Sequence, residues 1–155
     1  MPLVRIGAFI PVDDPREALR MVVDYRRWQE TAESMRSVVV DPQGDGTDVS
    51  TWEVVFRGGL MRWTERDHLD LDALRQSFSL IEGDPHAFAG TWTAVPREGG
   101  CSVVMDAQFD LGMPSLSHVL DPIAVEALED AVAEVLRGMF GPDTPLAFGD
   151  DVAVS

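Results

Sequence analysis

The segment DPIAVEALEDAVAEVLRGMFGP, residues 121–142, is the most regular stretch of the chain and decides which fold we expect. Its apolar residues recur at the spacing of one helix face, at Val125, Leu128, Val132, Val135, Leu136 and Met139. Glu126, Glu129, Asp130 and Arg137 occupy the other face. Asp121 suits an N-cap, Pro122 suits the first helical position, and Gly141 followed by Pro142 ends the pattern. These signals predict a long amphipathic helix over residues 123–140.

The region before this helix consists mainly of strand patterns. The β-prone run Leu3–Ile10 is followed by Asp14 and Pro15, which suit the N-cap and first residue of a short helix. A second short helix is expected over Gln29–Met35. Six β-rich runs follow, at Ser37–Val40, Val49–Arg57, Leu60–Asp67, Leu74–Ile81, Phe88–Val95 and Cys101–Leu111. Turns rich in Gly, Asp and Pro separate most of them, which is typical of an antiparallel meander.

This order of elements predicts an α+β protein. A seven-stranded antiparallel sheet must bury one face, and the C-terminal helix is the one large element left to cover it. We therefore expect a helix-grip fold, with a curved sheet wrapped around the long helix and two short helices after the first strand. The domain should span residues 1–141, and residues 142–155 should form an acidic, loosely ordered tail. Because one helix cannot fill the whole concave side of a bent sheet, an apolar cavity is expected.

Composition excludes several classes of partner. Twelve basic and 27 acidic residues give a formal net charge of -15, which repels nucleic acids and anionic membranes. Apolar runs are too short to cross a bilayer, and the N-terminus lacks a signal-peptide pattern. The single cysteine, Cys101, cannot form an internal disulfide and is interpreted as a small buried residue. A cytoplasmic location is the expectation. The chain has no lysine, which excludes lysine Schiff-base chemistry.

Several motifs resemble one known family when their order is considered. They are Trp63-Thr64-Glu65-Arg66, then Glu82-Gly83 before Phe88, then Trp92, and finally the run from Phe109 to Pro114. Together they are similar to the polyketide aromatase/cyclase family of the START-like superfamily, over roughly residues 5–140. The same order is also similar to ubiquinone-binding START-like proteins.

The resemblance implies a pocket that binds an apolar, oxygenated, polyketide-like substrate and promotes cyclisation and dehydration without a cofactor. Contact with a carrier protein or biosynthetic enzyme of bacterial secondary metabolism is also implied. The alternative is a non-catalytic carrier of a lipid or quinone, and a ribosome-directed toxin module fits poorly with the charge. The oligomeric state stays open. The expected substrate-binding residues are Trp28, Trp52, Phe56, Trp63, Thr64, Phe78, Phe88, Trp92, Met105, Phe109, Leu128 and Val132.

Three polar residues are the catalytic candidates: Arg66, Glu65 and Tyr25. The resemblance places Arg66 in the pocket, where a guanidinium could polarise a carbonyl oxygen. Strand alternation argues the opposite, because Glu65 shares the face of Trp63 unless a bulge reverses the phase. We rank Arg66 above Glu65 on the strength of the motif. Tyr25 either donates a hydrogen bond to the ligand or simply packs at the end of its helix.

The three histidines, His68, His86 and His118, are expected in a strand end and two loops. They lack helical pairing and a partner cysteine, so the sequence predicts no metal site. His118 is the one histidine expected near an end of the pocket, where a general base could act.

Overall fold

The computed structural model describes residues 1–56 and 58–152. Arg57, predicted to end a strand, and residues 153–155, the end of the predicted tail, lie outside the described residues. The strands are β1 (Leu3–Ile10), β2 (Met35–Pro42), β3 (Thr47–Phe56), β4 (Gly59–Asp70), β5 (Arg75–Gly83), β6 (Ala87–Arg97), β7 (Gly100–Asp110) and β8 (Leu146–Phe148). The α-helices are α1 (Pro15–Val22), α2 (Trp28–Thr31) and α3 (Ser117–Phe140). The 3-10 turns are η1 (Tyr25–Arg27), η2 (Pro114–Leu116) and η3 (Gly149–Asp151).

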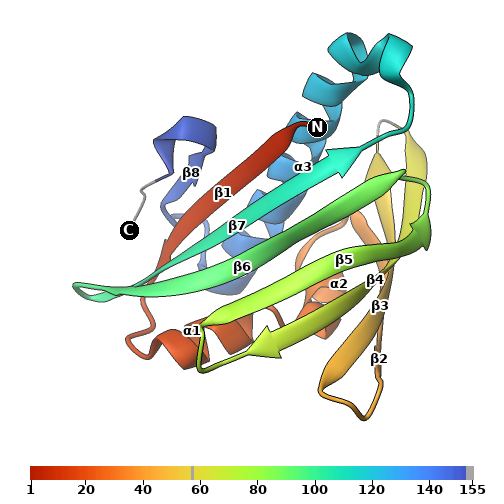
Figure 1. The fold of residues 1–155 in the computed structure, drawn as a ribbon. Helices are drawn as coiled ribbons and strands as arrows, with labels where there is room; N and C mark the ends of the chain where they lie inside the picture. Colours follow the sequence, from red (N-terminus) through yellow and green to blue (C-terminus); the bar gives the residue numbers. More distant parts are fainter. Residues whose placement is uncertain (57, 153–155) are drawn as a thin grey trace.

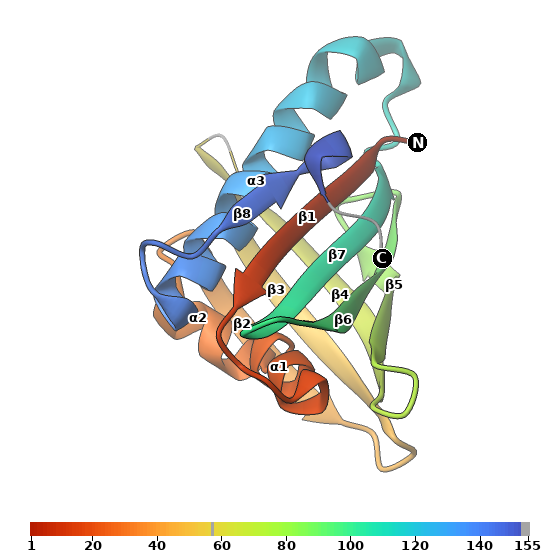
Figure 2. The ribbon, with the colours of Figure 1, turned by 90° about the vertical axis from the view of Figure 1, so that its left-hand side faces the viewer.

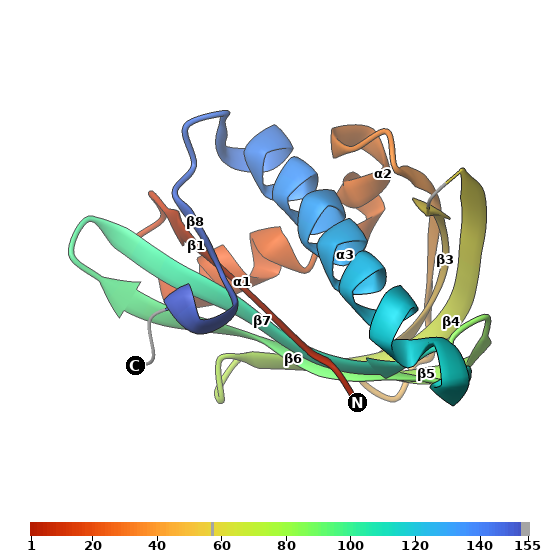
Figure 3. The same ribbon diagram turned by 90° about the horizontal axis from the view of Figure 1, so that it is seen from above.

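The eight strands of the described residues form one antiparallel sheet in the order β2-β3-β4-β5-β6-β7-β1-β8. The sheet bends strongly, and α3 crosses its concave side (Figures 1 and 3). The predicted α+β helix-grip class is confirmed, with eight strands in place of seven. The additional strand arises because Ile6, Gly7 and Ala8 of β1 pair with residues of β8.

Helix α3 buries a stripe that includes Val132, Val135 and Leu136. It begins at Ser117, four residues before the predicted cap at Asp121. The difference arises because η2 leads directly into α3, where the Ser117 hydroxyl donates to the Pro114 carbonyl at 3.0 Å. Pro122 is therefore inside the helix and does not open it. None of the described helices is long and apolar enough to cross a membrane.

The two short helices close one end of the sheet (Figure 2). The second begins at Trp28 and is over by Thr31, so the expected helix over Gln29–Met35 is displaced toward the N-terminus. The Trp28 indole N–H donates to the Val22 carbonyl at 2.8 Å, which holds α2 against the end of α1. Helix α3 passes close to α2. A Cβ added at Gly138 of α3 would lie only 2.7 Å from the carbonyl oxygen of Thr31 in α2.

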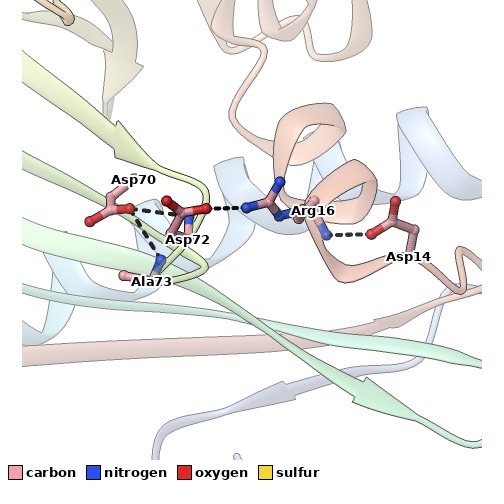
Figure 4. Close-up of polar contacts among 5 residues, drawn as sticks. All are labelled: Asp14, Arg16, Asp70, Asp72 and Ala73. Atoms are coloured by element: carbon pink, nitrogen blue, oxygen red, sulfur yellow. Dashed lines mark hydrogen bonds and ion pairs between the residues drawn. The ribbon is translucent and has the colours of Figure 1, made fainter.

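Helix α1 is anchored at its N-terminus to the turn between β4 and β5 (Figure 4). Asp14 caps the helix by accepting from the Arg16 N–H at 3.0 Å. The Arg16 guanidinium donates to the Asp72 carboxylate. Asp70 orders the turn by accepting the N–H groups of Asp72 and Ala73, each at 3.1 Å. Because the ion pair between Arg16 and Asp72 is exposed, it positions the helix against the turn more than it stabilises the fold.

The C-terminal segment is held against β1 through its last described residue. Val152 is 4% exposed and lies where a Cβ on Gly7 would meet it at 3.0 Å. The Phe9 N–H donates to the Pro145 carbonyl at 3.1 Å. The expectation of a loosely ordered tail is therefore wrong for residues 145–152, because β1 would otherwise present an unpaired edge.

Candidate functional site

An apolar cavity of about 100 Å³ lies between the concave face of the sheet and α3. All four tryptophans of the chain contribute to it. The predicted residues found in its wall are Tyr25, Trp28, Trp52, Phe56, Trp63, Glu65, Phe78, Phe88, Trp92, Met105, Phe109, Leu128 and Val132. Sequence reasoning missed further lining residues, including Met35, Val54, Met61, Pro85, Leu111 and Ala124. A dry cavity of about 150 Å³ in another protein holds a benzene molecule, so this smaller one has room for a single small ring at most.

Packed aromatic rings form the wall of the cavity. Trp52 and Trp63 stack with their centroids 5.5 Å apart and an interplanar angle of 3°. Tyr25 meets Trp52 edge to face at 4.8 Å, and Trp28 meets Trp92 edge to face at 6.0 Å. Each such contact adds attraction beyond simple burial and restricts ring rotation. The cavity wall is consequently rigid and presents π faces and edges to any ligand.

Strand β4 carries the acidic residue that reaches this wall. Side chains alternate along it, so Trp63, Glu65 and Asp67 point inward, where Glu65 is 2% and Asp67 is 3% exposed. The pairing of β4 with β3 has no break in register. The pairing of β4 with β5 is irregular at one point, where the extra residue is Ile81 of β5. The alternation of β4 is therefore preserved through this region.

Because this alternation is preserved, the prediction that Arg66 projects into the pocket is wrong. Arg66 lies on the exposed face of β4, where its Nη1 donates to the Thr47 hydroxyl at 3.3 Å. Thr64 also faces outward, with its hydroxyl 3.3 Å from the Thr51 hydroxyl, so its expected place in the binding wall is wrong as well. The family motif that suggested both residues does not define which face of the strand each side chain occupies.

Indole and hydroxyl donors hold the two buried carboxyl groups. The Trp63 indole N–H donates to Glu65 Oε1 at 2.7 Å. The Ser50 hydroxyl donates to Asp67 Oδ2 at 2.5 Å, and the Trp52 indole N–H donates to the Ser50 oxygen at 2.9 Å. The second oxygen of Asp67, Oδ1, is buried and has no hydrogen-bond partner among the described residues.

Burial changes how these groups titrate. Loss of water raises the pKa of the Glu65 carboxyl well above its usual value, and the neighbouring Asp67 carboxyl raises it further. Burial also raises the pKa of Asp67, against the hydrogen bonds that it accepts. The pKa of the Tyr25 hydroxyl is raised by burial first and then by Glu65 and Asp67. Glu65 can therefore hold a proton at a pH where an exposed glutamate has lost it.

A small polar cluster lies beneath the apolar wall. Ser50 and Gln76 are buried together with Asp67, and neither was among the residues predicted for the site. Gln76 lowers the pKa of Tyr25, against the effect of burial. Strand parity was the available signal for all three, because Ser50 shares the face of Trp52, and Gln76 shares the face of Phe78.

The remaining reactive side chains lie away from the cavity wall. His68, His86 and His118 are exposed, and His118 belongs to the first turn of α3 and not to a loop. Cys101 is fully buried, which raises the pKa of its thiol. Within the described part of the chain, no three His, Cys, Asp or Glu side chains cluster as a metal site would require.

A protein-family model for polyketide cyclase / dehydrase and lipid transport proteins matches residues 14–136. The chain belongs to this family. The matched range runs from the cap of α1 to Leu136 in α3, so it includes every strand from β2 to β7 and all the described residues that line the cavity. No curated protein matches the chain in sequence.

Several solved structures are similar to this chain in fold. The crystal structure of TTHA0849 from Thermus thermophilus is 27% identical, with a TM-score of 0.79, over 89% of this chain and 94% of that one. The Zhui aromatase/cyclase from Streptomyces sp. R1128 is 16% identical, with a TM-score of 0.64, over 88% and 94%. A START superfamily protein from Mycobacterium smegmatis is 14% identical, with a TM-score of 0.67, over 89% and 96%. The last two likenesses concern the fold alone.

Proposed function

We propose that the protein is a cofactor-independent enzyme of the polyketide cyclase / dehydrase and lipid transport family. It takes a small, mostly apolar, oxygenated compound into the cavity and promotes ring closure or dehydration there. The observation that carries this proposal is the position of Glu65, which is the one carboxyl group among the described residues of the cavity wall. A pure carrier needs no ionisable group at that place.

Glu65 has the properties that both steps require. In aldol closure, its carboxylate removes a proton next to one carbonyl, and the enolate carbon then bonds to a second carbonyl carbon. The resulting alkoxide takes up a proton and becomes a hydroxyl. In dehydration, a protonated carboxyl gives its proton to the leaving hydroxyl as the neighbouring C–H bond breaks. A raised pKa makes the Glu65 carboxylate a stronger base and keeps the carboxyl group protonated to a higher pH, which favours both roles.

Tyr25 is the second proposed catalytic group, because its hydroxyl side chain lines the cavity and is fully protonated at neutral pH. It serves as a hydrogen-bond donor to the substrate oxygen, where negative charge develops. Arg66 has no part in this scheme. We expect the enzyme in the cytoplasm, with a place in bacterial secondary metabolism.

The test uses 4-phenyl-2-butanone, a neutral ketone with one ring that exchanges its α-hydrogens slowly without a catalyst. In D₂O, the wild-type protein should speed α-deuteration, followed by NMR, because exchange needs the same proton removal as an aldol closure. Glu65→Gln should lower this rate about 10²-fold or more while ligand affinity stays within tenfold. Arg66→Gln is the matched control on the same strand, and its rate should equal that of the wild type.

A non-catalytic carrier of an apolar ligand is the second candidate. It is favoured by the wall itself, in which most of the lining side chains are aliphatic or aromatic. If the ketone binds but exchanges no faster than in buffer, and if Glu65→Gln changes nothing, the carrier function replaces the enzymatic one.

A further inference from the structure

Two carboxyl groups follow each other on the inward face of β4. Glu65 and Asp67 are two residues apart on this strand, so their Cα atoms are separated by roughly 6.5 Å. Carboxyl groups on two such positions can reach each other. Both side chains are almost fully buried, and neither forms an ion pair within the described part of the chain. Their negative charges are therefore not neutralised by an arginine.

Each of the two carboxyl groups has one oxygen that accepts a hydrogen bond. Trp63 donates to Oε1 of Glu65, and Ser50 donates to Oδ2 of Asp67. This leaves Oε2 of Glu65 and Oδ1 of Asp67, of which Oδ1 is buried and has no partner among the described residues. Such an oxygen is costly to leave unpaired. A protonated Glu65 would supply the missing donor, because a carboxyl group gains an O–H when it takes up a proton.

The hydrogen bonds behind Asp67 indicate which of the two groups carries the negative charge. Trp52 donates to the Ser50 oxygen at 2.9 Å, and Ser50 donates to Asp67 at 2.5 Å. Donors linked in series strengthen one another. The second distance lies in the range of about 2.5–2.7 Å that is typical of an O–H group bonded to an ionised carboxylate. Glu65 has the single indole donor of Trp63, so Asp67 is the better-stabilised anion.

We propose that Glu65 and Asp67 share one proton, which Glu65 carries and donates to Oδ1 of Asp67, so that Asp67 is a positioning residue that keeps Glu65 in its acid form. The hydrogen bond gives the unpaired oxygen its partner. It also places the negative charge behind the cavity wall, because Glu65 lines the cavity and Asp67 does not. The inference rests on the proposed function for the role of Glu65, and it adds a residue that acts through Glu65.

The effects of the two groups on each other have the signs that this pair predicts. Burial is the largest cause of the raised pKa of Glu65, and Asp67 raises it further. Burial also raises the pKa of Asp67, whereas Glu65 and Ser50 lower it. Two interacting carboxyl groups lose their protons in two separate steps that belong to the pair. Between these steps the pair holds a single proton.

The titratable side chains that face the pair from other elements of the described structure are Tyr25 of η1 and Asp48 of β3. The pKa of Tyr25 is raised by burial and then by the two carboxyl groups, so its hydroxyl stays protonated. Asp48 is opposite Asp67 in the register and also raises its pKa. On β5 the opposing residues, Leu80 and Phe78, are apolar, and the cavity-lining residues of α3 are aliphatic. None of these neighbours supplies a positive charge.

A shared proton gives the cavity wall a neutral carboxyl group. An ionised side chain among aromatic rings would be costly, whereas a protonated Glu65 is uncharged. In the proposed dehydration, Glu65 gives this proton to the leaving hydroxyl, and the C–O electron pair departs with the water. The C–H electron pair forms the C=C bond, and the C–H proton returns to Glu65. Repulsion from the ionised Asp67 favours this return, and the pair again holds one proton.

The experiment is a ¹³C NMR titration of the full chain, labelled at the side-chain carboxyl carbons of Glu and Asp. The signals of Glu65 and Asp67 are assigned by their loss in Glu65→Gln and Asp67→Asn. In the wild type, Asp67 should ionise first, and Glu65 should stay protonated at a pH where the exposed glutamates are ionised. Asp67→Asn should lower the pKa of Glu65 by about one pH unit or more. Glu98→Gln, in an exposed turn, is the control and should change neither signal.

Ser50→Ala tests which carboxyl group is the anion. It removes the hydroxyl that donates to Asp67, so the pKa of Asp67 should rise and the first step should move to higher pH. If Glu65 were the anion, this step would belong to Glu65 and would stay in place. Thr51→Ala removes a hydroxyl from the next residue, on the exposed face of β3, and should change neither step. Circular dichroism checks that each variant folds.

The proposal is overturned if Glu65 ionises together with the exposed glutamates, if Asp67 holds the proton between the two steps, or if Asp67→Asn leaves the pKa of Glu65 unchanged. The first two outcomes are read from the wild type and do not depend on any variant. The titration needs no substrate, so it is separate from the test of the enzymatic function. A protein with the shared proton that fails to accelerate ketone deuteration would keep the pair and lose the proposed catalysis. A protein that accelerates deuteration while Glu65 titrates normally would do the reverse.

Discussion

The indole N–H of Trp63 donates a 2.7 Å hydrogen bond to Oε1 of Glu65, two residues further along the same strand. Both side chains face inward because residues i and i+2 share one side of a strand. Trp63 is itself held by its parallel stack on Trp52. The carboxyl group that we propose to be catalytic is therefore oriented by a rigid aromatic pair and not by a flexible side chain.

Trp63→Phe tests this orienting role. The substitution keeps a ring beside Trp52 but removes the N–H that favours the ionised form of Glu65, so the pKa of Glu65 should rise further. Because exchange requires the carboxylate as base, the rate of ketone deuteration should begin to rise at a higher pH than in the wild type. A purely structural role for Trp63 predicts a lower rate with an unshifted pH profile.

Glu65→Gln should change how stability depends on pH. The pKa of Glu65 is raised in the folded state, so between the unfolded and folded pKa values the folded protein binds more protons than the unfolded chain. The free energy of unfolding contributed by Glu65 must then fall as the pH rises through this window. Urea titrations should show the wild type losing stability relative to Glu65→Gln as the pH rises above the usual glutamate pKa. A constant difference would mean that Glu65 titrates normally.

The fold was predictable because its main signals are local. The meander of strands and the apolar stripe ending at Gly141 follow from periodicity and turn residues, and neither depends on contacts between distant segments. The start of α3 was misplaced because Pro122 is typical of a first turn, whereas η2 extends the helix backward. Strand β8 has only three residues, and its pairing with β1 spans nearly the whole chain, so no local pattern indicated it.

The site was predictable in its apolar part and less so in its polar part. Aromatic residues on alternating positions identify the wall, since burial follows strand phase. The family motif favoured Arg66, but the phase set by Trp63 already placed Glu65 inside. The groove beside α3 combines Ser34 with residues about a hundred positions away on α3, which only the folded chain brings together.

Leu136→Ala and Leu128→Ala should differ, because the two side chains meet different surroundings. Leu136 is fully buried, so its truncation should lower the free energy of unfolding by about 2–5 kcal/mol. Leu128 borders existing empty space, so its truncation should cost less and should strengthen the binding of a two-ring ligand such as naphthalene. Glu129→Ala should change stability by less than about 0.5 kcal/mol. Denaturant titration and ligand calorimetry measure these effects, and equal stabilities for both leucine variants would contradict the assigned cavity.

Removal of residues 142–155 should destabilise the domain, although the sequence suggested a loosely ordered tail. The truncation exposes the edge of β1 and the surface beneath Val152, whose burial alone contributes about 1.5–3 kcal/mol. Thermal unfolding should shift to lower temperature, and light scattering should show association through the open edge. A chain that lacks only residues 153–155 is the control. If both truncations melt alike, β8 does not stabilise the fold.

Asp67→Asn should move the pH profile in the direction opposite to Trp63→Phe. The Asp67 carboxyl raises the pKa of Glu65, so an uncharged amide in its place should bring that pKa down toward its usual value, while burial still keeps it high. Ketone deuteration should then begin to rise at a lower pH than in the wild type.

The Ser50 hydroxyl can still donate to the amide oxygen of this variant, so the neighbouring hydrogen bond is retained. The same measurement on Glu98→Gln, a change in the exposed turn between β6 and β7, provides the comparison. Two shifts of opposite sign, from residues on either side of Glu65, would identify its carboxyl as the titrating base, whereas profiles that coincide with the wild type would assign the proton transfer to another group.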